Sequence, residues 1–268
     1  MQDNSPLISV IFCVYNAEST LEDSLDSLLK QTYTNFEIIA LNDGSTDQSE
    51  SILNAYSKKD PRIKVLHQDN CGLTISLNRA IKKAQGKYLA RQDADDISLP
   101  TRLEKQVAFL ENNPDHFLIG SHFLDLDASN DSLKEPSFLH FPYSDTNVRL
   151  TLPMSNCFCH SSVLFRNDYT LVQSFYDESF TYAQDYEFWI RIAKHYKLAN
   201  LKDSLVYRRV HPDAISTKKQ KAQRYHAVRA KLRSFHLKPK PLPFLKTLCK
   251  DLAVISLPER LLSFLRST

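Results

Sequence analysis

Over the first hundred residues, short runs rich in β-branched side chains alternate with stretches whose apolar side chains recur at helical spacing. The runs predict four strands, and the stretches between them predict three helices. The strands are expected at residues 8–15, 36–41, 63–67 and 88–91. Strands that alternate with helices form βαβ units, so the pattern predicts an α/β fold with a mostly parallel central sheet flanked by helices.

The pattern weakens in the second half of the sequence. A helix is predicted over residues 101–111 and a strand over residues 117–126. Residues 129–182 are rich in turn formers, and we assign no element to them. A helix over residues 185–195 and a strand over residues 205–209 follow.

Residues 217–268 differ in charge from the rest of the chain. They contain 13 Lys and Arg but 2 acidic residues, whereas the preceding residues contain 21 basic and 29 acidic ones. Apolar side chains at helical spacing predict a basic amphipathic helix, namely Ala222, Tyr225, Val228, Leu232 and Phe235. Prolines at 239, 241 and 243 are expected to interrupt it before two apolar and basic segments, 244–257 and 259–266.

Such a tail is expected to dock peripherally on an anionic membrane surface, the alternatives being packing on the body or a solvated helix without a partner. A chain ending near Ser216 is then expected to keep its activity. No nucleic-acid-binding motif accompanies the tail, so nucleic acid is not expected as a partner. Asp3 precedes a short apolar run, unlike a secretory signal, and the five cysteines are sparse. We therefore expect a cytoplasmic protein at the inner face of the membrane.

Polar side chains follow three of the four predicted strands, where ligands bind in open α/β sheets. These clusters are Tyr15-Asn16, Asn42 to Asp47 and Gln92 to Asp96. The last contains Asp93, Asp95 and Asp96, whose carboxylates would repel one another without a cation or solvent. Oxygen ligands of this kind favour Mg²⁺ or Mn²⁺, although a surface turn is the alternative for any acidic triplet.

The four glycines form neither a dinucleotide-binding loop nor a Walker loop. Phosphate charge would then be met by a metal and by cationic side chains. The candidates are Arg91, Arg208, Arg209 and His211.

Taken together, several motifs resemble glycosyltransferase family 2, over about residues 7–216. They are Ser9 to Ile11 leading to Tyr15-Asn16, Asn42 to Asp47, Ala90 to Pro100 with Arg102, Gln184 to Trp189, and Tyr207 to His211. The resemblance implies a GT-A fold and inverting, metal-dependent transfer from a nucleotide sugar, most often UDP-linked, to a saccharide or lipid-linked acceptor. It is strongest to bacterial enzymes that extend lipooligosaccharide, capsule or O-antigen chains.

The resemblance also implies roles for donor-binding residues. Tyr15, Asn16 and Asp43 would contact the nucleotide, with the Asp43 carboxylate accepting from the uracil edge. Asp93 would lie near the ribose and diphosphate. Arg79 is a weaker donor-site candidate, and a solvated helix residue is its alternative.

For the metal and the reaction, the resemblance implies a further set of residues. Asp95 would be the chief metal ligand of the DxD motif, and His211 would face the metal or diphosphate. Asp96 would assist the metal or cap the next turn, and Arg209 would contact phosphate. Asp185 matches the catalytic base, which would take the acceptor proton during a single in-line displacement.

Two further positions concern the acceptor. Many relatives have Glu where this chain has Gln184, which could alter acceptor contacts or the pKa of the base. His160 matches a His of similar bacterial enzymes and would line the acceptor cleft, or else be structural. Phe188 and Trp189 are expected in the core.

The predicted organisation is a catalytic domain over residues 1–216 and a helical tail over residues 217–268. Within the domain, residues 1–100 would bind the nucleotide and residues 101–216 the acceptor. The rival functions are a nucleotidyltransferase, which would need a Gly-rich loop after the first strand, and a non-catalytic sugar-nucleotide-binding protein.

Overall fold

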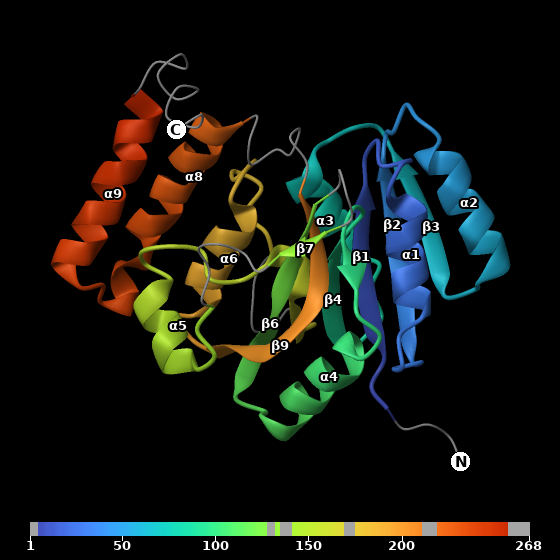
Figure 1. Cartoon of the computed structure of the whole chain (residues 1–268), viewed down its shortest axis with the longest axis horizontal. Coiled ribbons are helices and arrows are strands. Elements are labelled where there is room, and N and C mark those ends of the chain that lie inside the picture. Colours follow the sequence, from blue (N-terminus) through green and yellow to red (C-terminus); the bar gives the residue numbers. More distant parts are fainter. Residues whose placement is uncertain (1–4, 128–131, 135–140, 169–174, 211–218, 257–268) are drawn as a thin grey trace.

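The computed structural model describes residues 5–127, 132–134, 141–168, 175–210 and 219–256 (Figure 1). Its first half has the predicted alternation of strands and helices. The elements are β1 (Ile8–Val14), α1 (Leu21–Leu29), β2 (Phe36–Asp43), α2 (Ser49–Lys59), β3 (Ile63–Gln68), α3 (Leu73–Ile81) and β4 (Tyr88–Asp93). All four predicted strands are confirmed, with bounds that differ by no more than two residues.

The second half contains more elements than its periodicity predicted. They are β5 (Ile97–Ser98), α4 (Arg102–Asn112), β6 (His116–Asp127), β7 (Leu133–Lys134), α5 (Asp145–Thr151), the 3-10 helix η1 (His160–Ser162), β8 (Leu164–Arg166), α6 (Gln184–Ile192) and β9 (Lys197–Val210). The prediction of a last strand over residues 205–209 was too short. Polar residues such as Lys202 and Asp203 hid its first part, which pairs with β6.

The nine strands form one sheet in the order β3-β2-β1-β4-β8-β6-β9-β5, with β7 paired to β6. The pairs β3-β2, β2-β1 and β1-β4 are parallel, as are β6 and β9. β8 joins these two parallel groups by antiparallel pairing with β4 and β6. The fold class predicted from the sequence, a mostly parallel sheet flanked by helices, is therefore confirmed.

Helices bury both faces of the sheet. On one face, leucines of α1 and α4 pack with Val10, Phe12 and Ile38. On the other, α3 and α6 pack with Ile11 and Ile39. Phe188 and Trp189 of α6 are fully buried there, as predicted.

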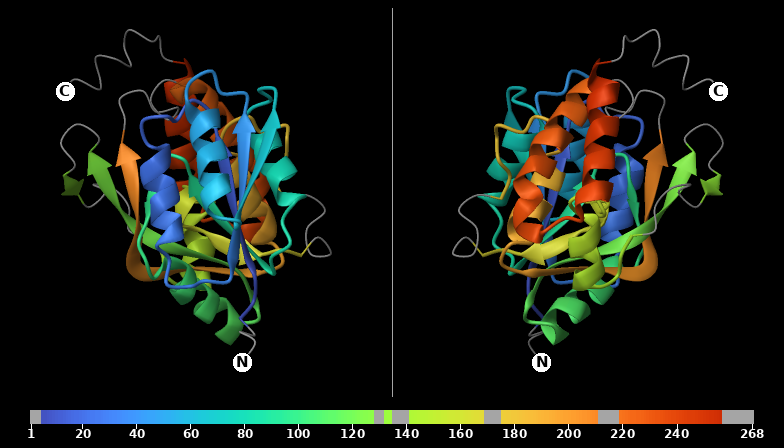
Figure 2. Two further views of the ribbon diagram at one scale, coloured as in Figure 1. Left: turned by 90° about the vertical axis from the view of Figure 1, so that its right-hand side faces the viewer. Right: turned by 90° about the vertical axis from the view of Figure 1, so that its left-hand side faces the viewer.

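The tail forms α8 (Gln220–Arg233), a 3-10 helix (Ser234–Leu237) and α9 (Pro241–Ser256). α8 packs on α6, and α9 packs on α8 at the outer edge of the molecule (Figures 1 and 2). The predicted stripe is not buried as one face, because Val228 is buried while Tyr225, Leu232 and Phe235 are exposed. Within the described residues, no helix is long and apolar enough to cross a membrane.

Candidate active site

The carboxyl ends of β1, β2 and β4 meet at one edge of the sheet, because the three strands are parallel neighbours. Just beyond β1, Asn16 adopts a left-handed conformation with φ 49°. Its Oδ1 accepts from the N–H of Thr46 at 2.8 Å, and its N–H donates to Ser45 Oγ at 3.1 Å. The loops after β1 and β2 are thus joined, and Tyr15 stands beside them with 53% of its surface exposed.

Asp43 ends β2 and is buried among hydrogen-bond donors. Its carboxylate accepts from Gln68 Nε2 at 2.6 Å and from the N–H groups of Cys71 and Gly72 at 2.8 and 2.9 Å. Arg79 donates to Gln68 Oε1 at 2.7 Å. The structure therefore brings Arg79 and Asp43 together through Gln68.

Asp93 ends β4 and is paired with the buried guanidinium of Arg91. Ser161 Oγ donates to Asp93 Oδ2 at 2.6 Å and accepts from its N–H at 3.0 Å. Burial acts to raise the pKa of Asp93, but Arg91 and the Ser161 hydroxyl outweigh it and hold the pKa below its ordinary value. Asp93 is therefore held as a carboxylate, and Arg91 is engaged with it.

Asp95 and Asp96 lie in different surroundings. Asp95 is partly exposed, whereas Asp96 is buried and accepts from the N–H of Arg209 at 2.9 Å. Burial, with the nearby charges of Asp95 and Asp93, raises the pKa of Asp96 well above its ordinary value. The Asp96 carboxyl is therefore engaged with the main chain of β9.

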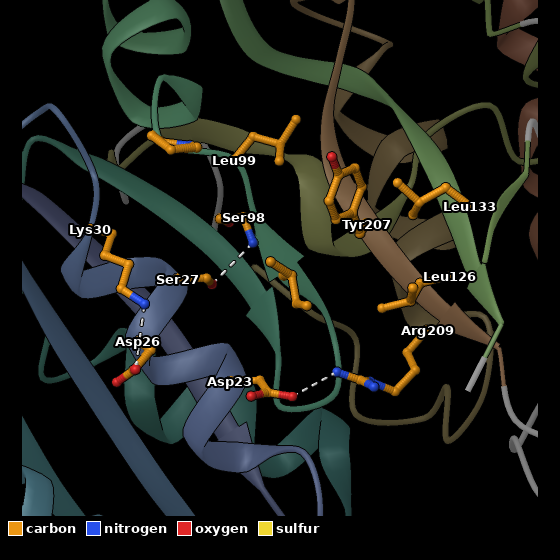
Figure 3. Close-up of a pocket in the computed structure, with 12 residues that line it drawn as sticks. Asp23, Asp26, Ser27, Lys30, Ser98, Leu99, Leu126, Leu133, Tyr207 and Arg209 are labelled. Carbon is orange, nitrogen blue, oxygen red and sulfur yellow. Dashed lines mark hydrogen bonds and ion pairs between the residues drawn. The ribbon is translucent and has the colours of Figure 1, made fainter. Parts of the chain in front are cut away.

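Arg209 also stabilises this loop. Its Nε donates to the Asp95 carbonyl at 3.0 Å, and its guanidinium pairs with Asp23 of α1 at 3.1 Å (Figure 3). It lines a cavity of about 540 Å³ with Tyr207 and residues of α1 and β5. Arg209, which was expected to contact phosphate, is thus engaged with the Asp95 carbonyl and with Asp23.

The other expected cations differ in placement. Arg208 pairs with Asp125 at 2.7 Å and stacks over the Phe123 ring, so its guanidinium is engaged with β6. His211 lies outside the described residues. Among the described residues, no group of three or more His, Cys, Asp or Glu side chains is arranged to hold a metal. Magnesium sites often need only one or two carboxylates, since water and substrate phosphates complete the shell.

Asp185 lies in the first turn of α6, directly after Ala183 and Gln184. Ala183 has φ 52°, a left-handed conformation that is uncommon outside glycine and clusters at functional sites. Asn156 Nδ2 donates to Asp185 Oδ2 at 2.7 Å. Burial raises the pKa of Asp185, and the charge of Asp93 adds to the effect.

His160 lies near Asp93 and Arg91. Its Nε2 is 2.8 Å from the Tyr176 hydroxyl, and its ring packs edge-to-face against Trp189. Burial and the charge of Arg91 lower the pKa of His160 to about 3, so the imidazole is neutral at physiological pH. Gln184 is buried at the start of α6.

One segment contacts both ends of this site. Asn156 holds Asp185, and Ser161, five residues later, holds Asp93. Sequence reasoning singled out the intervening His160 but gave these two residues no role. In the sequence, Asn156 and Ser161 are polar residues that flank an apolar, cysteine-containing run. That pattern does not indicate which side chains they hydrogen-bond.

Comparison with known proteins identifies the family. Residues 9–171 match the sequence profile described as Glycosyl transferase family 2, which is more than half of the 268 residues. The chain belongs to glycosyltransferase family 2. A relative in this family, the O-antigen biosynthesis glycosyltransferase WbnJ of Escherichia coli, is 33% identical over 253 residues, covering 92% of this chain and 96% of WbnJ.

Solved structures support the family fold. TarS of S. aureus in complex with UDP-GlcNAc superposes with a TM-score of 0.69 at 20% identity, covering 91% of this chain and 71% of TarS. The mannosyltransferase PcManGT of Pyrobaculum calidifontis, in complex with GDP-Man and Mn²⁺, gives a TM-score of 0.66 at 17% identity, covering 99% and 80%. The GT-A fold expected for this family 2 glycosyltransferase is confirmed.

Proposed function

We propose that this family 2 glycosyltransferase transfers a sugar from a nucleotide sugar to an acceptor hydroxyl with inversion at the anomeric carbon. The observation that carries the proposal is the segment from Asn156 to Ser161, which holds Asp185 on one side and Asp93 on the other. Asp93 is an ionised carboxylate at the donor edge, and Asp185, held by the same segment, is a carboxyl of raised pKa. Two such groups suit the two ends of a displacement reaction.

The donor is proposed to be a UDP-sugar, with its base at Asp43 and Tyr15. Asp43 is a carboxylate at the end of β2, and Tyr15 presents an exposed ring at the end of β1, which suits stacking on a base. TarS binds UDP-GlcNAc and PcManGT binds GDP-Man, so the fold accommodates more than one nucleotide. The contacts of Asp43 with the base are then proposed to select UDP over other nucleotides.

A divalent cation, Mn²⁺ or Mg²⁺, fits the chemistry of the donor edge. Asp95 is partly exposed and its main chain is held by Arg209, while Asp93 is kept ionised beside it. We propose that Asp95 is the protein's chief ligand and that His211 faces the same group. When bound, the cation supplies positive charge that stabilises the leaving diphosphate.

Asp185 is proposed to act as the base. Its raised pKa makes it a better proton acceptor than an ordinary carboxylate, and the Asn156 amide orients it. The acceptor hydroxyl would lose its proton to Asp185 as its oxygen attacks the anomeric carbon from the face opposite the diphosphate. An α-linked donor would then yield a β-glycoside.

The acceptor is proposed to be a saccharide, free or lipid-linked, at the inner face of the cytoplasmic membrane. Gln184 directly precedes Asp185, and His160 lies in the segment whose Asn156 holds Asp185. Both residues are proposed to contact the acceptor. The role of WbnJ in O-antigen biosynthesis supports cell-surface polysaccharide synthesis. Residues 1–216 are proposed to hold the catalytic residues, with the acceptor-binding half after about residue 100, and α8 is proposed to stabilise them through its contact with α6.

A panel of nucleotide sugars tests the function. Full-length enzyme with Mn²⁺ or Mg²⁺ is expected to release nucleoside diphosphate from one donor class, most readily UDP-linked, and EDTA is expected to abolish the release. Binding without release from any donor, with or without saccharide acceptors, would favour a non-catalytic sugar-nucleotide-binding protein. Formation of pyrophosphate from a nucleoside triphosphate would favour a nucleotidyltransferase.

A further inference from the structure

The outward face of α9 is apolar. Phe244 and Asp251 point toward α8 and are buried, so the opposite side of the helix faces outward. That side carries a stripe spaced by three and four residues, formed by Leu242, Leu245, Cys249 and Leu252. The three leucines are 79%, 55% and 48% exposed. Exposed leucines in this number along one helix mark an interaction surface.

Lysines border the stripe. Lys246 and Lys250 lie one helical turn apart along one edge of it, and both are exposed. Lys238 and Lys240, also exposed, precede the helix. The surface is thus apolar along its centre and cationic at its edge.

The acidic residue of this helix does not contribute to the surface. Asp251 is 1% exposed and accepts from Arg224 Nη1 and Lys231 Nζ, both at 2.6 Å. Its charge is therefore neutralised by Arg224 and Lys231 within the contact between α8 and α9. The outward face keeps its full positive charge.

α8 is instead attached to the catalytic body. Arg233 pairs with Glu187 of α6 at 2.9 Å and with Asp177 at 2.8 Å. Arg229 donates to the Ser179 carbonyl at 3.0 Å. This attachment leaves α9 as the outermost helix, facing the viewer beside α8 in the right-hand view of Figure 2. Within the tail, 217–268, that was expected to dock, the exposed apolar face therefore lies on α9.

We propose that the outward face of α9 lies on an anionic phospholipid bilayer, with Leu242, Leu245 and Leu252 in the interface and Lys246 and Lys250 against the headgroups. An apolar face edged by lysines is the pattern of an interfacial helix. A second copy of the chain fits less well, because a symmetric contact would bring both lysine pairs together. The inference specifies the membrane contact in the proposed function, but it uses no residue of the active site.

Vesicle co-sedimentation of the full-length chain tests the inference. Vesicles containing phosphatidylglycerol are expected to pellet the protein, whereas pure phosphatidylcholine vesicles are not, and higher salt is expected to weaken binding. Each surface lysine typically contributes about 1 kcal/mol. Lys246→Gln with Lys250→Gln is therefore expected to weaken partitioning roughly 30-fold.

Matched variants separate this contact from general effects of charge and hydrophobicity. Lys58→Gln with Lys59→Gln makes the same charge change on α2, at the opposite end of the molecule (Figure 1), and is expected to bind normally. Leu245→Ser with Leu252→Ser is expected to lose binding, and Leu245→Met with Leu252→Met to keep it. All four variants are expected to hydrolyse donor like the parent. Donor hydrolysis therefore tests the proposed function, and vesicle binding tests the membrane contact separately. Equal vesicle binding by the two lysine variants would overturn the inference. So would a parent protein that forms a dimer and does not bind vesicles, if the serine variant is monomeric.

Discussion

Ser161 and Asp93 form two reciprocal hydrogen bonds: the Ser161 hydroxyl donates to the Asp93 carboxylate at 2.6 Å and accepts from its N–H at 3.0 Å. Asn156 holds Asp185 by a single hydrogen bond, which its Nδ2 donates to Asp185 Oδ2 at 2.7 Å. Because one short segment contacts both carboxylates, its conformation determines where each lies.

Ser161→Ala is expected to weaken donor binding and to lower the free energy of unfolding by about 1.5–3 kcal/mol, the usual range for a hydrogen bond to a charged group. Ser162→Ala is the matched control. Ser162 is equally buried, but its hydroxyl bonds the Ser121 and Cys159 carbonyls instead of Asp93. Chemical denaturation and donor KM are the measurements. Equal changes in donor KM for the two variants would mean that Ser161 has only a structural role.

Asn156→Ala is expected to move the acid limb of the pH profile of kcat to higher pH. The Asn156 hydrogen bond stabilises the Asp185 carboxylate and lowers its pKa, so its loss raises a pKa that burial has already raised. A base must be ionised to accept a proton, so turnover needs a pH above this pKa. Asn147→Ala, at an exposed position, is the control. An unchanged limb in Asn156→Ala would contradict the role of Asp185 as the base.

The sequence predicts the donor side of this site much better than the acceptor side. Asp43 and Asp93 follow regular buried strands, and parallel pairing brings strand ends to one edge. Asn156 and Ser161 lie in an irregular segment, where periodicity carries no information about partners. Arg91 was expected to contact phosphate, but it pairs with Asp93. The pattern of a strand does not predict which neighbour such a long side chain will contact. Which face of α9 is exposed could not be predicted either, because it depends on which face packs on α8.

Asp43→Ala is expected to reduce the preference for UDP over GDP and CDP in a competition titration, because a specific hydrogen bond to the base is lost. The substitution also releases the N–H groups of Cys71 and Gly72. Gln68→Ala is the matched control, since it loosens the same turn and leaves the carboxylate in place. A preference for UDP that survives in Asp43→Ala would remove Asp43 from the proposed base contact.

Arg233→Ala is expected to lower the free energy of unfolding by about 1–3 kcal/mol. Glu187 is fully buried and would keep only Arg191 of its two arginine partners. For the same reason a chain ending at Ser216, which loses α8, is expected to lose stability and donor hydrolysis together, in contrast to the expectation from sequence. Lys197→Ala removes an exposed pair with Asp115 and is expected to cost much less stability than Arg233→Ala. Full stability of the shortened chain would show that α8 is dispensable.

We propose that Asp95 binds the metal and donor and that Asp185 accepts the acceptor proton. Measuring both turnover and donor affinity in one variant of each residue tests this central claim most directly. Asp95→Asn is expected to lose metal-dependent donor binding and transfer together, since an amide lacks the charge that holds the cation. Asp185→Asn is expected to bind donor like the parent but to lower kcat roughly 100-fold or more. Asp203→Asn, a surface carboxylate paired with Lys105, is expected to change neither quantity. The account would be contradicted by normal transfer in Asp95→Asn, or by a loss of donor affinity in Asp185→Asn as large as its loss of turnover.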